Sequence, residues 1–247
     1  IQYESVYRSN SIPRSRRNAS ACSNDGMPRR PLSWVPLIAE TGGQNVMIAD
    51  SSALPEQLVV DVLQSAFNSA GQRCSALRVL FLQDDVADRM IRLLAGAMKE
   101  LIVADPRWLS TDVGPVIDGA AKDELQAHAD RMEKEFKLLA RAPLQRNLNG
   151  HYLAPCAFEI DSITSLEKEV FGPILHVVRY RSRDLDRVID EINGTGYGLT
   201  LGIHSRIDRT QRYIASRVQA GNCYINRNMI GAVVGVQPFG GERLSGT

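Results

Sequence analysis

The sequence has few cysteines, few histidines and no long apolar run. Its four cysteines and four histidines form neither a CxxC pair nor an HExxH pattern. Nothing therefore indicates a disulfide framework, a zinc ribbon or another metal site. No apolar stretch approaches the roughly 18 residues that a membrane span requires. A reducing cytoplasm, with no membrane partner, is the expected setting.

An excess of charge of either sign is also missing. The chain carries 29 Lys and Arg against 28 Asp and Glu, a formal net charge of +1, which argues against nucleic acid as the main partner. Apolar residues make up 44% of the chain and charged residues 23%, which is typical of a soluble globular protein. A chain of this length can bury roughly 70–75% of its unfolded surface, so it needs no covalent or metal staple.

Residues 1–35 differ from the rest of the chain. They hold six arginines against two acids, a balance of +4, which leaves −3 for the remainder. The segment is rich in Ser, Asn, Arg and Pro, and it lacks the apolar core of a secretory signal. We interpret it as an irregular Arg- and Ser-rich segment without an assigned role. A transit peptide and a nucleic-acid-binding arm are the alternatives that its arginines leave open.

From residue 36 onward, strand patterns alternate with helix patterns. Strands are predicted at residues 35–40, 44–49, 78–82, 174–178, 199–203 and 223–225. Helices are predicted from Pro55 to residue 70, from Asp84 as N-cap to about Val103, and at residues 119–140, 184–192 and 208–218. This alternation indicates an α/β domain with a largely parallel sheet.

One cysteine is distinguished by its surroundings. Cys74 lies in the loop GQRCSA, between a predicted helix end and a predicted strand. Gly71 allows a sharp turn there, and Arg73 adds a positive charge that favours a thiolate. A single cysteine is more often a small buried hydrophobe, a description that fits Cys156 and Cys223 in or beside apolar runs. Glu40 ends a predicted strand before a Gly-Gly turn, a place suited to a general base.

Six motifs follow one another along the chain. They are Glu-x-Gly-Gly-x-Asn at 40–45, Gly-Gln-x-Cys at 71–74, Glu-Val-Phe-Gly-Pro at 169–173, Gly-Tyr-Gly-Leu-Thr at 196–200, Gly-Asn-Cys-Tyr-Ile-Asn at 221–226, and Pro-Phe-Gly-Gly at 238–241. In this order and spacing, residues 36–247 resemble the aldehyde dehydrogenase superfamily. PLIAETGGQN and SAGQRCSALRVL are most similar to the glutamate γ-semialdehyde dehydrogenase half of bacterial bifunctional proline-utilisation proteins.

The resemblance implies a reaction and its catalytic residues. The reaction is the NAD-dependent oxidation of L-glutamate γ-semialdehyde, the open form of 1-pyrroline-5-carboxylate, to L-glutamate in proline catabolism. Cys74 would attack the aldehyde carbon to give a thiohemiacetal, which is then oxidised to a thioester. Glu40 would activate the water that hydrolyses the thioester.

Binding residues are implied in the same way. Glu169 matches the family residue that binds the nicotinamide ribose hydroxyls of NAD, and Phe171 lies at that end of the cofactor. Gly231 and Ala232 match the loop whose backbone N–H groups hold the substrate carboxylate, and Ser75 would add a hydroxyl beside the nucleophile. The intact protein is expected to be a homo-oligomer.

The resemblance covers only part of a family member. The cofactor domain of the family lies mostly before Glu40, and residues 36–42 match only its edge. No GxGxxG is found, because Gly194, Gly196 and Gly198 alternate without the third glycine of that fingerprint. The sequence thus predicts a C-terminal fragment: an aldehyde dehydrogenase catalytic domain, α/β in class, with the cofactor domain largely missing.

Two functions stay open at this stage. The first is the dehydrogenase catalytic domain, for which we expect neither tight NAD binding nor turnover by the chain alone. The second is a truncated, inactive remnant with a structural or partner-binding role.

Overall fold

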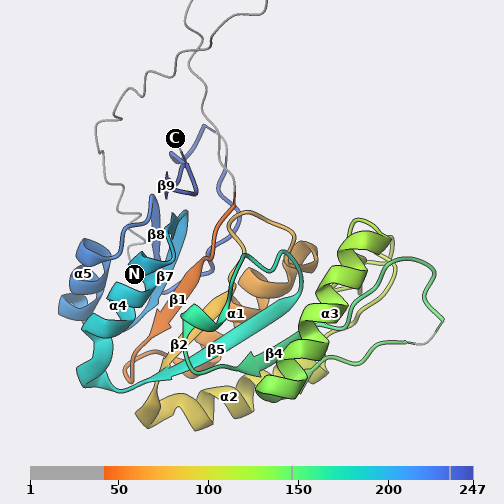
Figure 1. The fold of residues 1–247 in the computed structure, drawn as a ribbon, viewed down its shortest axis with the longest axis horizontal. Coiled ribbons are helices and arrows are strands. Elements are labelled where there is room, and N and C mark those ends of the chain that lie inside the picture. The colour runs from red at the N-terminus through yellow and green to blue at the C-terminus, as the bar shows by residue number, and fades with distance from the viewer. Residues whose placement is uncertain (1–41, 146, 234, 247) are drawn as a thin grey trace, which may run out of the picture.

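The computed structural model describes residues 42–145, 147–233 and 235–246. Within them, one sheet has the strand order β3-β4-β5-β2-β1-β7-β8 (Figure 1). Its strands are β1 (Val46–Ala49), β2 (Val79–Gln83), β3 (Lys137–Arg141), β4 (Cys156–Glu159), β5 (Ile174–Tyr180), β7 (Thr200–His204) and β8 (Asn222–Ile225). Neighbouring strands are parallel except for the antiparallel pair β3–β4. The predicted α/β class with a parallel-rich sheet is confirmed.

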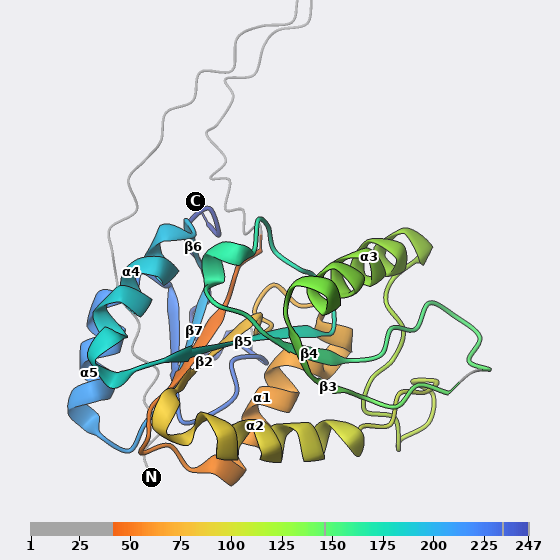
Figure 2. The ribbon, with the colours of Figure 1, turned by 60° about the horizontal axis from the view of Figure 1, so that its bottom comes forward.

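Helices cover both faces of this sheet. They are α1 (Pro55–Phe67), α2 (Asp84–Lys99), α3 (Gly119–Glu135), α4 (Leu185–Gly194) and α5 (Asp208–Arg217), with short 3₁₀ turns η1 (Asn68–Gly71), η2 (Ile163–Ser165) and η3 (Ser182–Asp184). A crossover between parallel strands is right-handed. The chain steps one way across the sheet from β1 to β2, and the other way from β5 to β7 and β8. Accordingly α1 and α2 lie on one side and α4 on the other (Figure 2).

The central strands are covered along their whole length. Every residue of β1 and β2 is buried, as expected for parallel strands with helices on both faces. The apolar stripe of α1 explains its place in this core, since Leu58, Val62 and Ala66 are each 1% exposed and recur at helical spacing. A second, two-stranded sheet joins β6 (Tyr197–Gly198) to β9 (Glu242–Arg243).

Several helix boundaries differ from the prediction. The helix that was predicted to run to about Val103, α2, ends at Lys99. Asp84 is the first helical residue of α2 rather than its N-cap, which is Gln83. The predicted helix at 119–140 ends at Glu135, and the chain continues as strand β3. The apolar residues there have helical spacing, but pairing of β3 with β4 makes the segment a strand. The local sequence pattern does not contain this pairing contact.

The predicted strand at 35–40, the irregular segment 1–35 and Glu40 lie outside the described residues. Among the described helices, none combines the length and the apolar character needed to cross a bilayer.

Candidate active site

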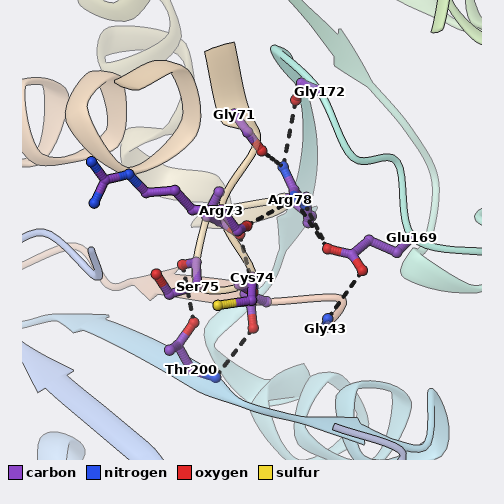
Figure 3. Close-up of polar contacts among 11 residues, drawn as sticks. Gly43, Gly71, Arg73, Cys74, Ser75, Arg78, Glu169, Gly172 and Thr200 are labelled. Carbon is purple, nitrogen blue, oxygen red and sulfur yellow. Dashed lines mark hydrogen bonds and ion pairs between the residues drawn. The ribbon is translucent and has the colours of Figure 1, made fainter. Parts of the chain in front are cut away.

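The candidate site lies at the amino ends of four adjacent parallel strands. Gly43 precedes β1, Cys74 precedes β2, Glu169 precedes β5, and Thr200 begins β7. Because these strands are parallel neighbours in the sheet, their amino ends form one edge. Residues from four distant segments therefore meet there (Figure 3). Ligands of open α/β sheets commonly bind at the opposite, carboxyl edge.

A tight turn after α1 places Cys74 at the amino ends of these strands. After α1, three consecutive residues adopt left-handed backbone: Ser69 at φ 55°, Ala70 at φ 52° and Gly71 at φ 66°. A Cβ on Gly71 would lie 2.3 Å from the carbonyl oxygen of Gly172, so only glycine permits this approach. Cys74 follows three residues later and is partly exposed. The turn therefore brings the cysteine loop against the 169–172 segment.

Buried side chains hold the carbonyl groups of the cysteine loop from behind. Asn45, 2% exposed, donates from Nδ2 to the carbonyls of Cys74 at 2.6 Å and Ala76 at 2.9 Å. The Thr200 hydroxyl donates to the carbonyl of Ser75 at 3.2 Å. Since buried side-chain hydrogen bonds of this kind fix backbone geometry, the loop is held rigidly. Sequence reasoning quoted Asn45 within a motif but gave it no role.

Arg78 is the other residue that sequence reasoning missed. Its side chain is 1% exposed and donates from Nη1 to the Gly71 carbonyl at 2.6 Å and from Nη2 to the Arg73 carbonyl at 3.1 Å. Nε and Nη2 also donate to Glu169 Oε1 at 3.3 and 3.0 Å. One guanidinium thus joins the cysteine loop to Glu169 (Figure 3). No local pattern marks it, because Glu169 lies 91 positions away.

The position of the Arg73 side chain does not support its predicted role as a positive charge beside the thiol. Arg73 is exposed, donates from Nε to the Ser69 hydroxyl at 3.0 Å, and extends away from Cys74 (Figure 3). Arg78, by contrast, is a positive charge that does interact with Cys74. Burial lowers the pKa of the Arg78 guanidinium, and attraction to Glu169 and then to Cys74 raises it in part.

Glu169 and Phe171 lie together on the segment before β5. The second carboxylate oxygen of Glu169, Oε2, accepts from the backbone N–H of Gly43 at 3.1 Å. A Cβ on Gly42, at φ 101°, would lie 2.3 Å from that oxygen, so the Gly-Gly turn makes room for the carboxylate. The Phe171 ring is 45% exposed, and the Arg78 guanidinium carbon lies 5.0 Å from its centre.

The candidate substrate loop connects to the cysteine loop through one serine. Gly231, at φ 85°, and the partly exposed Ala232 follow β8. Just before them, the Met229 N–H donates to the Ser65 hydroxyl at 3.0 Å. The Ser65 carbonyl accepts from Leu77, which follows the cysteine loop, at 2.9 Å. The structure thus anchors both loops to the end of α1.

The three motifs after residue 195 have structural contacts. Asn222 donates from Nδ2 to the carbonyls of Leu199 and Gly240 at 2.9 and 2.7 Å. The Gly198 N–H donates to the Ser245 hydroxyl at 3.1 Å. These bonds join all three motifs at the β7–β8 edge, where they support the start of β7.

The buried His176 and the half-buried His128 pack behind Arg78. His176 Nδ1 lies 3.1 Å from the Arg78 carbonyl oxygen, and the Nε2 atoms of His176 and His128 lie 2.9 Å apart. The carbonyl only accepts, so His176 Nδ1–H donates to it, and His128 then donates to His176 Nε2. Burial lowers the pKa of His176 to about 3 and that of His128 to about 4. Both rings are neutral near pH 7.

Acid is therefore expected to destabilise the fold through this pair. An unfolded histidine has a pKa of about 6.5, so below that pH the unfolded state binds more protons. The stabilisation is complete above pH 6.5 and is lost as pH falls toward the folded values. Between pH 7.5 and 4.5, His176 alone lowers the free energy of unfolding by about 2–3 kcal/mol. Urea unfolding at both pH values measures this loss.

Variants separate this pair from other acid effects. His204, whose pKa burial lowers to about 4, adds a loss of the same sign to every protein compared. His176→Asn should reduce the pH dependence, and replacement of the exposed His151 by Gln should leave it unchanged. Equal pH dependence in wild type and His176→Asn would contradict the assignment.

The sequence of this chain is similar to those of known proteins. A family model described as "Aldehyde dehydrogenase family" matches residues 30–247. The bifunctional protein PutA of Klebsiella aerogenes is 54% identical over 218 residues, which cover 86% of this chain and 17% of that protein. This chain therefore spans less than a fifth of that relative's length.

Solved structures are also similar to this chain, in both fold and sequence. Proline utilization A from Bradyrhizobium japonicum has a TM-score of 0.83 at 61% identity, covering 86% of this chain and 22% of that one. A 1-pyrroline-5-carboxylate dehydrogenase from Thermus with bound NAD has a TM-score of 0.78 at 31% identity, covering 85% and 40%.

Proposed function

The chain belongs to the aldehyde dehydrogenase family, and we propose that it carries the nucleophile of an enzyme that oxidises L-glutamate γ-semialdehyde to L-glutamate in proline catabolism. The observation that carries this proposal is the Cys74 loop, held by Asn45, Thr200 and Arg78 beside Glu169. The identity to PutA of Klebsiella aerogenes supports the choice of substrate. A cytoplasmic, homo-oligomeric full-length protein is part of the same proposal.

Cys74 is the nucleophile in this proposal. Its thiolate sulfur forms a bond to the aldehyde carbon, and the carbonyl oxygen becomes the oxyanion of a thiohemiacetal. The backbone N–H of Cys74 is the oxyanion donor we assign, because preorganised backbone donors stabilise such charge without reorganisation. Loss of a hydride from the thiohemiacetal carbon leaves a thioester on Cys74. Glu40, outside the described residues, takes a proton from the water that attacks this thioester. Glutamate and the free thiolate are released.

The residues before β5 fit the ribose end of a nicotinamide cofactor, which we take to be NAD. Glu169 accepts from Arg78 and Gly43, which orients its carboxylate, and a carboxylate is an acceptor suited to ribose hydroxyl donors. Phe171 offers a ring that is 45% exposed. A nicotinamide held by these residues would supply the acceptor for the hydride that leaves the carbon attached to Cys74.

The direct test is NADH formation from 1-pyrroline-5-carboxylate. We expect the full-length protein to form NADH at a steady rate. We expect none from the 247-residue chain, because Glu169 and Phe171 contact only one end of the cofactor. The absence of NADH formation by the full-length protein would reject the proposal and favour the inactive remnant.

The substrate carboxylate is assigned to the backbone N–H groups of the Gly231–Ala232 turn, because such a turn binds an anion without a permanent charge. Ser75 contributes a hydroxyl on the nucleophile side. This places the two ends of glutamate semialdehyde on two loops that Ser65 anchors together.

Introducing an acid at this turn tests the assignment. Ala232→Asp should raise KM for glutamate semialdehyde about tenfold or more, because it repels a carboxylate whose charge-assisted contact contributes about 1.5–3 kcal/mol. Simple aliphatic aldehydes, which lack the carboxylate, should be little affected. Ala104→Asp, at a partly exposed loop alanine elsewhere, is the matched control. An equal loss with both classes of aldehyde would mean that the turn is merely structural.

A further inference from the structure

Arg78 lies between the Cys74 loop and Glu169, which the proposed reaction uses, but is not itself one of the reacting or binding groups. Its guanidinium contacts the loop that presents Cys74 through the Gly71 and Arg73 carbonyls. It also contacts Glu169, the candidate cofactor-binding residue, at the carboxylate oxygen Oε1. The same side chain interacts electrostatically with Cys74. A change at Arg78 therefore acts on both groups at once.

We propose that Arg78 is a positioning residue that locks the Cys74 loop and Glu169 into one arrangement and supplies the positive charge that favours the Cys74 thiolate. This inference rests on the proposed function only for the role of Cys74 as nucleophile.

The shape of the contacts requires an arginine. The Gly71 carbonyl, the Arg73 carbonyl and Glu169 Oε1 lie in three directions around one planar group, each within 3.1 Å of a guanidinium nitrogen. A guanidinium presents five N–H donors in a fixed plane, whereas a lysine ammonium is a compact point charge that does not span such a fork. An arginine that is 1% exposed also needs these acceptors, because a buried charge without partners is strongly destabilising.

Glu169 sets how strong a positive potential Arg78 produces at Cys74. Its carboxylate lies 3.0 Å from Arg78 and partly neutralises the guanidinium. Removing the Glu169 charge should therefore strengthen the positive potential at Cys74, while removing Arg78 should abolish it. The two substitutions shift thiolate formation in opposite directions. If Arg78 were only a structural link between the loops, the two substitutions would not shift thiolate formation in opposite directions.

The test is the pH dependence of Cys74 alkylation by iodoacetamide in the 247-residue chain, followed on the Cys74 peptide by mass spectrometry. Arg78→Met should raise the midpoint by about 1 pH unit. Glu169→Gln should lower it. Arg73→Met, the matched control, should leave it unchanged, because that guanidinium is directed away from the thiol. The midpoint is the better readout, since nucleophilicity rises with thiol basicity and offsets part of the rate change at a single pH.

A second cysteine reports whether each variant folds. Cys156 is 1% exposed, and burial raises the pKa of its thiol to about 12, so it is alkylated only when the chain unfolds. If Arg78→Met exposes Cys156, Arg78→Gln, which also removes the charge but keeps a side-chain N–H donor, replaces it. Arg78→Lys keeps the charge and should hold the midpoint within a few tenths of the wild-type value.

The sign of the Glu169→Gln shift decides the proposal. A raised or unchanged midpoint in that variant overturns it, as does a shift in Arg73→Met equal to that in Arg78→Met. Alkylation requires neither aldehyde nor NAD. If the opposed shifts are found but the full-length protein forms no NADH, the proposed function fails and the role of Arg78 stands. If NADH forms without the opposed shifts, the role of Arg78 fails alone.

Discussion

Replacing Cys74 with alanine in the full-length protein is expected to abolish aldehyde oxidation and esterase activity together. Both reactions form a covalent bond to the same sulfur, so neither has a bypass. Loss of a nucleophile typically lowers kcat by about 10⁴-fold or more. NADH absorbance with 1-pyrroline-5-carboxylate and nitrophenolate release from p-nitrophenyl acetate measure the two activities.

A second cysteine provides the control for this substitution. Cys223 lies on β8 and is 9% exposed, so Cys223→Ala removes a second sulfur, which is buried. It should retain both activities. Esterase activity that survives in Cys74→Ala would assign the nucleophile to another residue.

Glu40→Gln is expected to separate the two halves of the reaction. Acylation of Cys74 does not need the general base, whereas hydrolysis of the thioester does. A burst of NADH near one equivalent per active site should precede steady turnover that is slower by about 10²–10⁴-fold. Rapid-mixing absorbance resolves the burst, and Glu100→Gln, an exposed carboxylate at the end of α2, should show normal turnover. An inactive variant without a burst would mean that Glu40 acts before the thioester forms.

Sequence patterns captured the elements whose structure is set locally. The helix from Pro55 follows from a proline at the first turn and an apolar stripe at helical spacing. The buried strands β2 and β5 follow from short apolar runs between loop signals. At residues 137–141 the same reasoning failed, because the strand exists only through its pairing with β4.

The candidate site was predicted unevenly for a related reason. Motifs point to Cys74 and Glu169 one at a time, and the turn before Cys74 is visible in its glycine. The contacts that join them are not local: Asn45 reaches the Cys74 carbonyl across 29 positions, and Arg78 reaches Glu169 across 91. In sequence, Arg78 looks like an ordinary charged residue before a strand. Only the sheet order brings these segments to one edge.

The most direct measurement is the mass of the Cys74 peptide from full-length Glu40→Gln, quenched in acid during the burst with 1-pyrroline-5-carboxylate and NAD. Acid keeps the α-amino group of the substrate protonated, so it does not attack the thioester and close a lactam. We expect a γ-glutamyl group on Cys74 that hydroxylamine removes, and none on Cys156 or Cys223. A glutamyl adduct on a different residue would contradict Cys74 as the nucleophile, as would a full NADH burst with an unmodified Cys74.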